Sequence, residues 1–216
     1  MHIQHKTITV LLADDHEVIR EGVRHLLENA NDMSVVGEAQ DGKEVKELVT
    51  KLQPNILVLD LKMPSISPFE LEKWVRENHP QTITLVLTAH DRDYYLSGMI
   101  DAGIAGYLDK NERGENLIAA IRRAARGEVF FTGEQMDRAR KWQHNAGEIW
   151  KKLTKRQREV LILLGQGHSN KAIAEKLGIT LKTVAYHVSA ILDLLNVGSR
   201  NKAVAWLHKY FPDDLE

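Results

Sequence analysis

The chain of 216 residues contains no cysteine and no long hydrophobic run. The absence of cysteine excludes a disulfide framework and a cysteine-based metal site, and it agrees with a reducing compartment. No apolar run approaches the ~20 residues that a membrane-spanning helix needs, and the first six residues, Met-His-Ile-Gln-His-Lys, lack the core of a signal peptide. Together these absences predict a cytoplasmic protein with no membrane partner.

Charge is nearly balanced over the whole chain, with 29 Lys and Arg against 30 Asp and Glu, but it is unevenly distributed. Residues 1–126 carry 15 basic and 20 acidic side chains, whereas residues 149–211 carry 11 basic and 3 acidic ones. An acidic half followed by a basic half indicates two domains, the second of which could meet a polyanion. A merely solvated basic surface would give the same count, so the charge needs a motif behind it.

Five short runs of β-branched and other apolar residues alternate with helical patterns in the first half of the chain. Buried parallel strands have this composition because both faces of their sheet are covered. Five such repeats predict a doubly wound, five-stranded parallel sheet with helices on both faces. The predicted strands are residues 7–13, 34–39, 55–59, 82–87 and 105–109, and the predicted helices are about 16–29, 42–52, 68–78, 93–102 and 115–126.

Polar side chains stand where four of these strands end. Asp14 and Asp15 follow the first strand, and Asp60 follows the third. Thr88 and Lys110 follow the fourth and the fifth. Because the carboxyl ends of parallel strands form the site of an open sheet, these side chains are predicted to converge. Clustered carboxylates need a cation among them, and an all-oxygen set suits Mg²⁺. The pattern is typical of phosphoryl transfer to the lone Asp60, with Lys110 and Thr88 binding phosphoryl oxygens.

Four motifs occur in order between about residue 6 and residue 126: Leu-Leu-Ala-Asp14-Asp15-His, Val-Leu-Asp60-Leu-Lys-Met-Pro64, Leu-Thr88-Ala89 and Gly106-Tyr107-Leu-Asp-Lys110. They resemble the flavodoxin-like receiver domain of two-component response regulators. The resemblance implies that a sensor histidine kinase phosphorylates Asp60. It also implies a Mg²⁺ site made by Asp14, Asp15, Asp60 and the backbone carbonyl of Lys62. Thr88 and Tyr107 would rearrange together after phosphorylation, Tyr107 turning inward.

The second half contains no strand pattern. Residues 127–148 are predicted to be a linker holding a helix, with Gly133 and Asn145-Ala146-Gly147 as breaks. Two short helices, capped by Ser169 and Thr180 and joined by a turn at Gly178, form a helix-turn-helix, whose second helix can enter the major groove of DNA. Two further helices are expected to begin at a capping box, Thr154 with Gln157, and at Ser199.

Four stretches of this half resemble the LuxR-type DNA-binding domain: Leu153-Thr-Lys-Arg-Gln-Arg-Glu159-Val-Leu, Gly167-His-Ser-Asn-Lys-Ala-Ile-Ala174, Leu177-Gly-Ile-Thr-Leu-Lys-Thr183-Val and His187-Val. The two halves together resemble the NarL/FixJ class of response regulators. We therefore expect a receiver domain at residues 1–126, a linker at 127–148 and an all-α helix-turn-helix domain at 149–216. In the family pattern residues of the third helix face DNA, which implies contacts by Lys182, Thr183, Tyr186 and His187. The basic side chains of Lys171 and Arg200 are further candidates for DNA contacts.

The chain departs from the family patterns in both halves. Ala185 replaces a usual basic residue, and Asp193 stands where further basic residues are common, so phosphate contacts are lost. Ser65-Ile-Ser-Pro68 replaces the usual Asp-Gly ending of the loop after the phosphoacceptor. The glycine of the usual ending tolerates a positive φ, whereas Pro68 has a φ fixed at about −65°. Lys62 and His90 flank the site and are predicted to tune the lifetime of the phosphoryl group.

The resemblances imply a response regulator whose phosphorylation controls dimerisation, DNA binding and transcription. It would not be an enzyme beyond phosphotransfer to its own Asp60 and autodephosphorylation. One alternative is a phosphorylation-dependent protein-interaction switch whose helical domain binds DNA weakly or not at all, which Ala185 and Asp193 favour. A phosphatase of the haloacid dehalogenase type is disfavoured. Such enzymes carry an Asp-x-Asp motif after the first strand, whereas Asp60 follows the third strand and Lys62 stands where the second aspartate of the motif would be.

Overall fold

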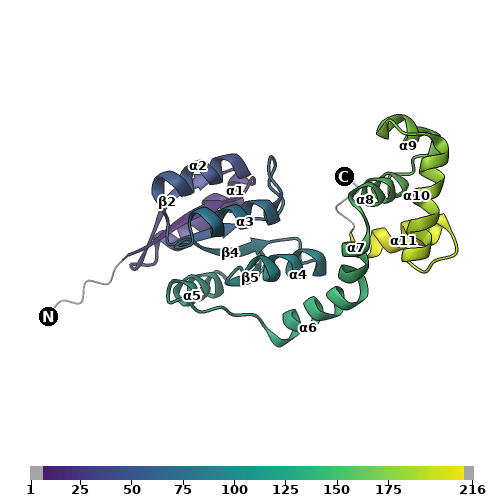
Figure 1. Ribbon diagram of the computed structural model, residues 1–216. Coiled ribbons are helices and arrows are strands. Elements are labelled where there is room, and N and C mark those ends of the chain that lie inside the picture. The colour runs from purple at the N-terminus through teal and green to yellow at the C-terminus, as the bar shows by residue number, and fades with distance from the viewer. Residues whose placement is uncertain (1–6, 212–216) are drawn as a thin grey trace. The chain divides into compact units, whose positions relative to one another are not determined.

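The computed structural model describes residues 7–211, and its first half is a five-stranded parallel sheet with the order β2-β1-β3-β4-β5 (Figure 1). The predicted fold is therefore confirmed, and each predicted strand end lies within one residue of the observed one. The strands are β1 (Ile8–Ala13), β2 (Met33–Ala39), β3 (Ile56–Leu59), β4 (Ile83–Thr88) and β5 (Gly106–Asp109). The helices between them are α1 (Glu17–Glu28), α2 (Gly42–Leu52), α3 (Pro68–Asn78), α4 (Asp93–Ala102) and α5 (Gly114–Ala125).

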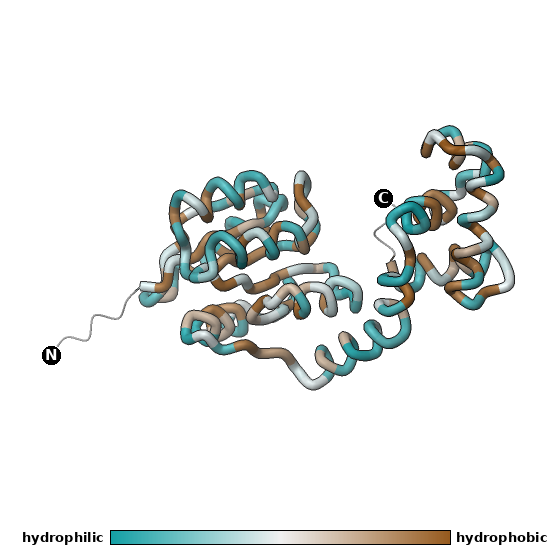
Figure 2. Tube along the Cα trace, in the orientation of Figure 1, coloured by the Kyte–Doolittle hydropathy of each residue, from teal (hydrophilic) through white to brown (hydrophobic). Residues whose placement is uncertain are grey.

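Two hydrophobic cores lie on the two faces of this sheet. Leu12 and Val58 point to the face that α1 and α5 cover, and Leu11 and Leu57 point to the face that α2, α3 and α4 cover. All four side chains are almost inaccessible to solvent. Hydrophobic residues accordingly gather in the strands (Figure 2). Since both faces are sealed, polar strand-end residues are left to the carboxyl edge of the sheet, where β1 and β3 adjoin at the switch in strand order.

The second half consists of helices only, among the residues that the structure describes. They are α6 (Gly133–Trp142), a π-helical turn η1 (Gln143–Gly147), α7 (Glu148–Lys152), α8 (Lys155–Gly165), α9 (Asn170–Leu177), α10 (Leu181–Leu194) and α11 (Arg200–Tyr210). Leu161 of α8, Ile191 of α10 and Leu207 of α11 are fully buried. Helices α9 and α10 are bent at 110° to each other, within the range of a helix-turn-helix.

The predicted capping residues of this half are confirmed. The Thr154 hydroxyl accepts a hydrogen bond from the Gln157 amide at 3.2 Å, and the Gln157 side chain accepts one from the Thr154 amide at 2.8 Å. Ser169, Thr180 and Ser199 cap α9, α10 and α11 in the same way through their hydroxyls. Gly178 ends α9 with a φ of +62°, a conformation that glycine adopts without strain.

The predicted break at Asn145-Ala146-Gly147 is wrong. These residues form the π-helical turn that joins α6 to α7, so the backbone stays helical through both. Gly147 lies against the Trp142 ring, and a Cβ at this position would be 2.8 Å from a ring carbon. The glycine therefore allows close packing inside the turn and does not interrupt it. Trp142 and Trp150 also contact the buried Phe211, with ring centroids 5.6 and 4.1 Å away, as expected of packing anchors.

The chain divides into two compact units, and the boundary between them along the chain lies between Met136 and Asp137, inside α6. The domain limits given from the sequence, at residues 126 and 149, stay a prediction. No single helix among residues 7–211 is long and apolar enough to cross a membrane, and the pair α9 and α10 reaches that length and composition only together, across its bend.

Candidate functional site

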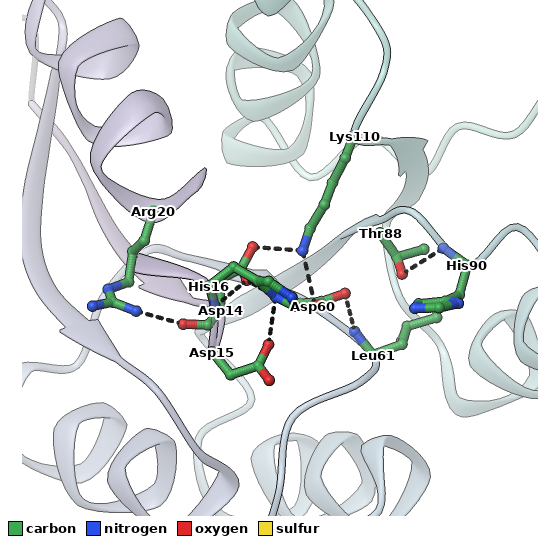
Figure 3. Close-up of polar contacts among 9 residues, drawn as sticks. All are labelled: Asp14, Asp15, His16, Arg20, Asp60, Leu61, Thr88, His90 and Lys110. Carbon is green, nitrogen blue, oxygen red and sulfur yellow. Dashed lines mark hydrogen bonds and ion pairs between the residues drawn. The ribbon is translucent and has the colours of Figure 1, made fainter. Parts of the chain in front are cut away.

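The predicted acidic residues meet at the carboxyl edge of the sheet (Figure 3). Asp14 and Asp15 follow β1, and Asp60 follows β3, the neighbouring strand. Asp14 and Asp60 are only 6% and 3% exposed, whereas Asp15 is exposed. Parallel pairing of β1 with β3 is sufficient to place these residues side by side, because it aligns the ends of the two strands.

Lys110, which follows β5, bridges two of the carboxylates. Its Nζ lies 2.7 Å from Asp14 Oδ2 and 2.9 Å from Asp60 Oδ2, and its side chain is 8% exposed. Burial opposes the charge of Lys110, but the hydrogen bonds and charges of Asp14 and Asp60 outweigh it and raise the pKa of the lysine. The ammonium is therefore held in its charged form between the two acids.

Backbone contacts fix the position of Asp60. Its amide donates to the Ala13 carbonyl at 2.8 Å, continuing the strand pairing, and its Oδ1 accepts from the Leu61 amide at 2.8 Å. Its Oδ2 faces Lys110. One carboxylate oxygen is thus held by a backbone amide and the other by the Lys110 ammonium.

Sequence reasoning missed two residues that hold the first acidic pair. Arg20 Nη1 donates to the Asp14 carbonyl at 2.7 Å, while its Nε donates to Glu38 Oε2 at 2.9 Å. His16 Nδ1 lies 2.8 Å from Asp15 Oδ1. His16 directly follows the acidic pair and could have been suspected, whereas nothing in the local sequence connects Arg20 with Glu38.

The side chains present fit a divalent cation with oxygen ligands. One ligand atom from each of Asp14, Asp15, His16 and Asp60 lies within 4.8 Å of the others. Carboxylate oxygens predominate in this set, and they are the ligands that Mg²⁺ prefers. Lys62, whose carbonyl was expected to complete the set, is half-buried two residues after Asp60, and its role as a ligand stays a prediction.

Thr88 and Tyr107 are both hydrogen-bonded to the backbone of His90. The Thr88 hydroxyl, fully buried, accepts a hydrogen bond from the His90 amide at 3.1 Å. The Tyr107 hydroxyl donates to the His90 carbonyl at 2.9 Å, and the residue is 4% exposed. The ring of Tyr107 is buried in this structure, and its rearrangement together with Thr88 after phosphorylation stays a prediction. The His90 backbone joins the two side chains.

The loop after Asp60 accommodates Pro68 at the start of a helix. Pro68 is the first residue of α3, where its fixed φ is compatible with a helix and its missing N–H needs no partner. The positive φ of this loop falls instead on Ser65, at +82°. The Pro64 carbonyl next to it accepts from the Gly42 amide at 3.2 Å, so the loop rests on the start of α2.

The predicted DNA contacts lie on or beside the helix-turn-helix. Lys171 and Lys182 are exposed on α9 and α10, and Tyr186 is 70% exposed. Thr183 lies at the start of α10, with its Oγ1 2.8 Å from Thr180 Oγ1, and His187 is half-buried.

Arg200 differs from the other predicted DNA contacts. Its guanidinium donates to the His168 carbonyl and, at 3.2 Å, to Asn170 Oδ1, so it ties α11 to the turn before α9. Arg200 therefore has a structural role in this domain, and its contact with DNA stays a prediction.

The sheet with its acidic edge defines a receiver domain, and the capped helices define a helix-turn-helix domain. Two families match these parts: the response regulator receiver domain over residues 10–122, and the bacterial regulatory proteins of the luxR family over residues 151–207. The chain therefore belongs to the two-component response regulators of the NarL/FixJ class, which join a receiver domain to a LuxR-type DNA-binding domain. Members of this family are not conventional enzymes.

Individual relatives support the assignment over most of the chain. The response regulator protein VraR of Staphylococcus aureus is 35% identical over 204 residues, which cover 94% of this chain and 98% of VraR. A structure of two RcsB dimers bound to two parallel DNAs is 26% identical, with a TM-score of 0.60, and covers 94% of this chain and 98% of that one. The NarL receiver domain from Mycobacterium tuberculosis is 31% identical, with a TM-score of 0.55, over 57% of this chain and 99% of that one.

Proposed function

We propose that Asp60 accepts a phosphoryl group from a phosphohistidine of a sensor kinase and that this modification controls DNA binding by the helical domain. The observation that carries the proposal is the position of Asp60, almost buried beside Asp14 and 2.9 Å from the Lys110 ammonium. The proposal implies a cytoplasmic location, because bacterial DNA lies there.

In the proposed reaction a carboxylate oxygen of Asp60 attacks phosphorus, a P–O bond forms, and the P–N bond to the kinase histidine breaks. The histidine leaves as neutral imidazole if its other nitrogen carries a proton or if its leaving nitrogen gains one. Lys110 would follow the new charge from the carboxylate to a phosphoryl oxygen, and its raised pKa keeps it cationic throughout. Autodephosphorylation is the attack of water on the same phosphorus, which returns Asp60 and releases phosphate.

Asp14, Asp15 and Asp60 would hold Mg²⁺, with the Lys62 carbonyl as a further ligand. When bound, the ion offsets the repulsion between the carboxylates and the phosphoryl oxygens. Asp14 is aligned for this role by two contacts, the His16 amide on its Oδ1 at 2.9 Å and Arg20 on its carbonyl. These contacts restrict the carboxylate to the side of the strand on which Asp60 lies.

Asp60→Asn should abolish labelling of the full-length protein by phosphoramidate, whose P–N bond stands for that of phosphohistidine. The amide removes the nucleophilic oxygen but keeps the size of the side chain. Labelling is measured by intact mass, and the modified residue is located by fragmentation. Asp109→Asn is the matched control, because Asp109 also ends a strand but only accepts from the Asn111 amide at 2.7 Å. Retained labelling of Asp60→Asn would contradict the assignment.

For the second part of the proposal, α10 offers the exposed residues Lys182 and Tyr186 at a capped helix start, and the RcsB structure contains dimers bound to DNA. We infer that this chain also binds DNA as a homodimer when phosphorylated. The protein-interaction switch stays the second candidate, because Ala185 and Asp193 are both exposed on α10 and neither can bind a phosphate. Selection from a random DNA pool, with and without beryllofluoride, separates the two: enrichment of a two-fold site supports DNA control, and no enrichment supports the switch.

A further inference from the structure

The segment between α5 and α6 lies along the open edge of β5, the last strand of the sheet. The Phe130 amide donates to the Ala105 carbonyl at 2.8 Å. Phe130 then packs into the core beneath α1 and α5, while Phe131 packs into the core beneath α2, α3 and α4. Side chains that alternate between the two faces are typical of a strand, so this segment extends the sheet by a short length of chain. Figure 2 shows it as a hydrophobic stretch leading into a hydrophilic α6.

Two neighbours hold Phe130 at this edge. The Arg123 guanidinium lies over its ring, 4.3 Å from the centroid. Gly106, the first residue of β5, faces the ring, and a Cβ there would lie 2.7 Å from two of its carbons. The Phe130 ring can therefore pack against β5 because Gly106 has no side chain.

Gln135 joins the following helix to the same strand. Its Oε1 accepts from the Thr132 backbone amide at 2.9 Å, and its backbone amide donates to the Thr132 hydroxyl at 3.1 Å. The two bonds form a capping box at the start of α6. The other end of its side chain is also used, since Nε2 donates to the Tyr107 carbonyl at 2.9 Å. A single amide group therefore both closes the cap of α6 and binds β5.

These contacts continue a line of hydrogen bonds that starts at the acidic site. The Lys110 amide donates to the Thr88 carbonyl at 3.0 Å. The Thr88 hydroxyl accepts from the His90 amide, and the His90 carbonyl accepts from the Tyr107 hydroxyl. The Tyr107 carbonyl then accepts from Gln135. Four hydrogen bonds of 2.9 to 3.1 Å thus join Lys110, Thr88, His90, Tyr107 and Gln135, in that order.

We propose that Gln135 is the positioning residue through which phosphorylation of Asp60 reaches the linker helix α6. This inference rests on the proposed function. When the Thr88 hydroxyl turns toward the phosphoryl group, the His90 amide loses its acceptor and the His90 carbonyl moves with Tyr107. The edge segment stays in place because both phenylalanines anchor it. The change therefore falls on the bond from Gln135 to Tyr107, and the first turn of α6 loses or re-forms its cap.

Gln135→Glu tests this inference, because glutamate keeps the acceptor of the capping box but loses the donor to the Tyr107 carbonyl. The matched control is Lys141→Gln, which changes the net charge in the same direction at an exposed position of the same helix. Amide hydrogen exchange of residues 136–142 is measured in the full-length proteins with Mg²⁺, before and after beryllofluoride is added. Occupancy of Asp60 is followed separately by the ¹⁹F signal of the bound beryllofluoride.

We expect exchange in α6 of the unmodified chain and of Lys141→Gln to change by a factor of ~5 or more on loading, the lower end of typical couplings between sites. In Gln135→Glu loading should be complete while the change in α6 falls below about twofold. An equal response in Gln135→Glu would overturn the inference, as would an unmodified chain that loads beryllofluoride without any change in α6. In both cases the proposed function would stand. Only failure of the unmodified chain to load would defeat the proposed function, and the inference with it.

Discussion

Glu72 is a buried carboxylate that lies far from the acidic site. It is 2% exposed on α3, and its Oε2 has no hydrogen-bond partner among residues 7–211. Together with Thr84 and Arg76 it lines a cavity of about 230 Å³ near the amino ends of β4 and β5. Burial raises the pKa of Glu72 to about 7, and the Thr84 hydroxyl and the Arg76 charge oppose this only in part. The residue therefore titrates near neutrality.

Stability of the receiver domain should fall as the pH rises from 4.5 to about 7. The pKa of Glu72 is about 7 in the folded chain and 4.5 in the unfolded chain, so between these pH values the folded state holds a proton that the unfolded state has lost. By linkage the free energy of unfolding is lower by up to about 3 kcal/mol once both states are ionised. Glu72→Gln, which resembles the protonated acid, should remove the loss and be the more stable protein at pH 8. Urea unfolding at pH 5, 6, 7 and 8, followed by NMR signals of the sheet, measures the effect.

Glu70→Gln is the control for this experiment, since Glu70 is exposed on the same helix. It removes the same charge without removing a buried carboxylate. If Glu72→Gln and Glu70→Gln gave the same dependence of unfolding free energy on pH, burial of Glu72 would not be the cause.

Single residues could be predicted from the sequence where a strand end fixes them. Asp14, Asp60 and Lys110 meet because parallel strands align their carboxyl ends, a property that every such sheet has. Arg20 and Gln135 could not be predicted, because each binds a backbone carbonyl, that of Asp14 or that of Tyr107, and carbonyl groups carry no signature in a sequence.

At the scale of helices and strands, local chemistry decided most boundaries. The strands were recognisable because each apolar run is bounded by polar or turn residues, and the helices of the second half because Thr154, Ser169, Thr180 and Ser199 cap them. The π-helical turn escaped prediction, since Asn145 and Gly147 ordinarily favour a break. Packing of Gly147 under Trp142 overrides that preference, and such packing depends on the fold of the whole segment.

Thr154→Ala should weaken the helical domain by about 1 kcal/mol, because the Gln157 amide loses its acceptor and half of the capping box is lost. Exchange rates of the α8 amides in the full-length protein report the change in the free energy of unfolding of this domain. Thr154→Ser keeps the hydroxyl and should leave these rates nearly unchanged. Equal weakening by alanine and serine would show that the methyl group of Thr154, and not its cap, stabilises α8.

At the scale of the whole molecule, the two halves differ in charge in the way that their tasks require. The receiver half is acidic and concentrates carboxylates at one edge of its sheet, while residues 149–211 carry 11 basic against 3 acidic side chains. The division was visible in the sequence, but the contacts of its individual basic residues were not. Arg200, for instance, contributes to the basic count and yet binds the His168 carbonyl and Asn170 within its own domain. The guanidinium keeps its charge there, because both partners are neutral, but its donors are used within the domain.

Ala185→Lys should strengthen DNA binding and make it more dependent on salt. Ala185 is exposed on α10 between Lys182 and Tyr186, so a lysine there adds one phosphate contact. One further contact steepens the slope of log K against log salt by ~0.9 and raises the affinity at low salt roughly threefold or more. Titration of the beryllofluoride-loaded protein against a selected DNA site, at salt concentrations from about 50 to about 200 mM, measures the slope and the affinity. Ala205→Lys adds the same charge to an exposed position of α11 and should change the slope much less. If the two lysines had equal effects, DNA would be responding to the overall charge of the domain and not to α10, and the assignment of α10 as the DNA-reading helix would have to be given up.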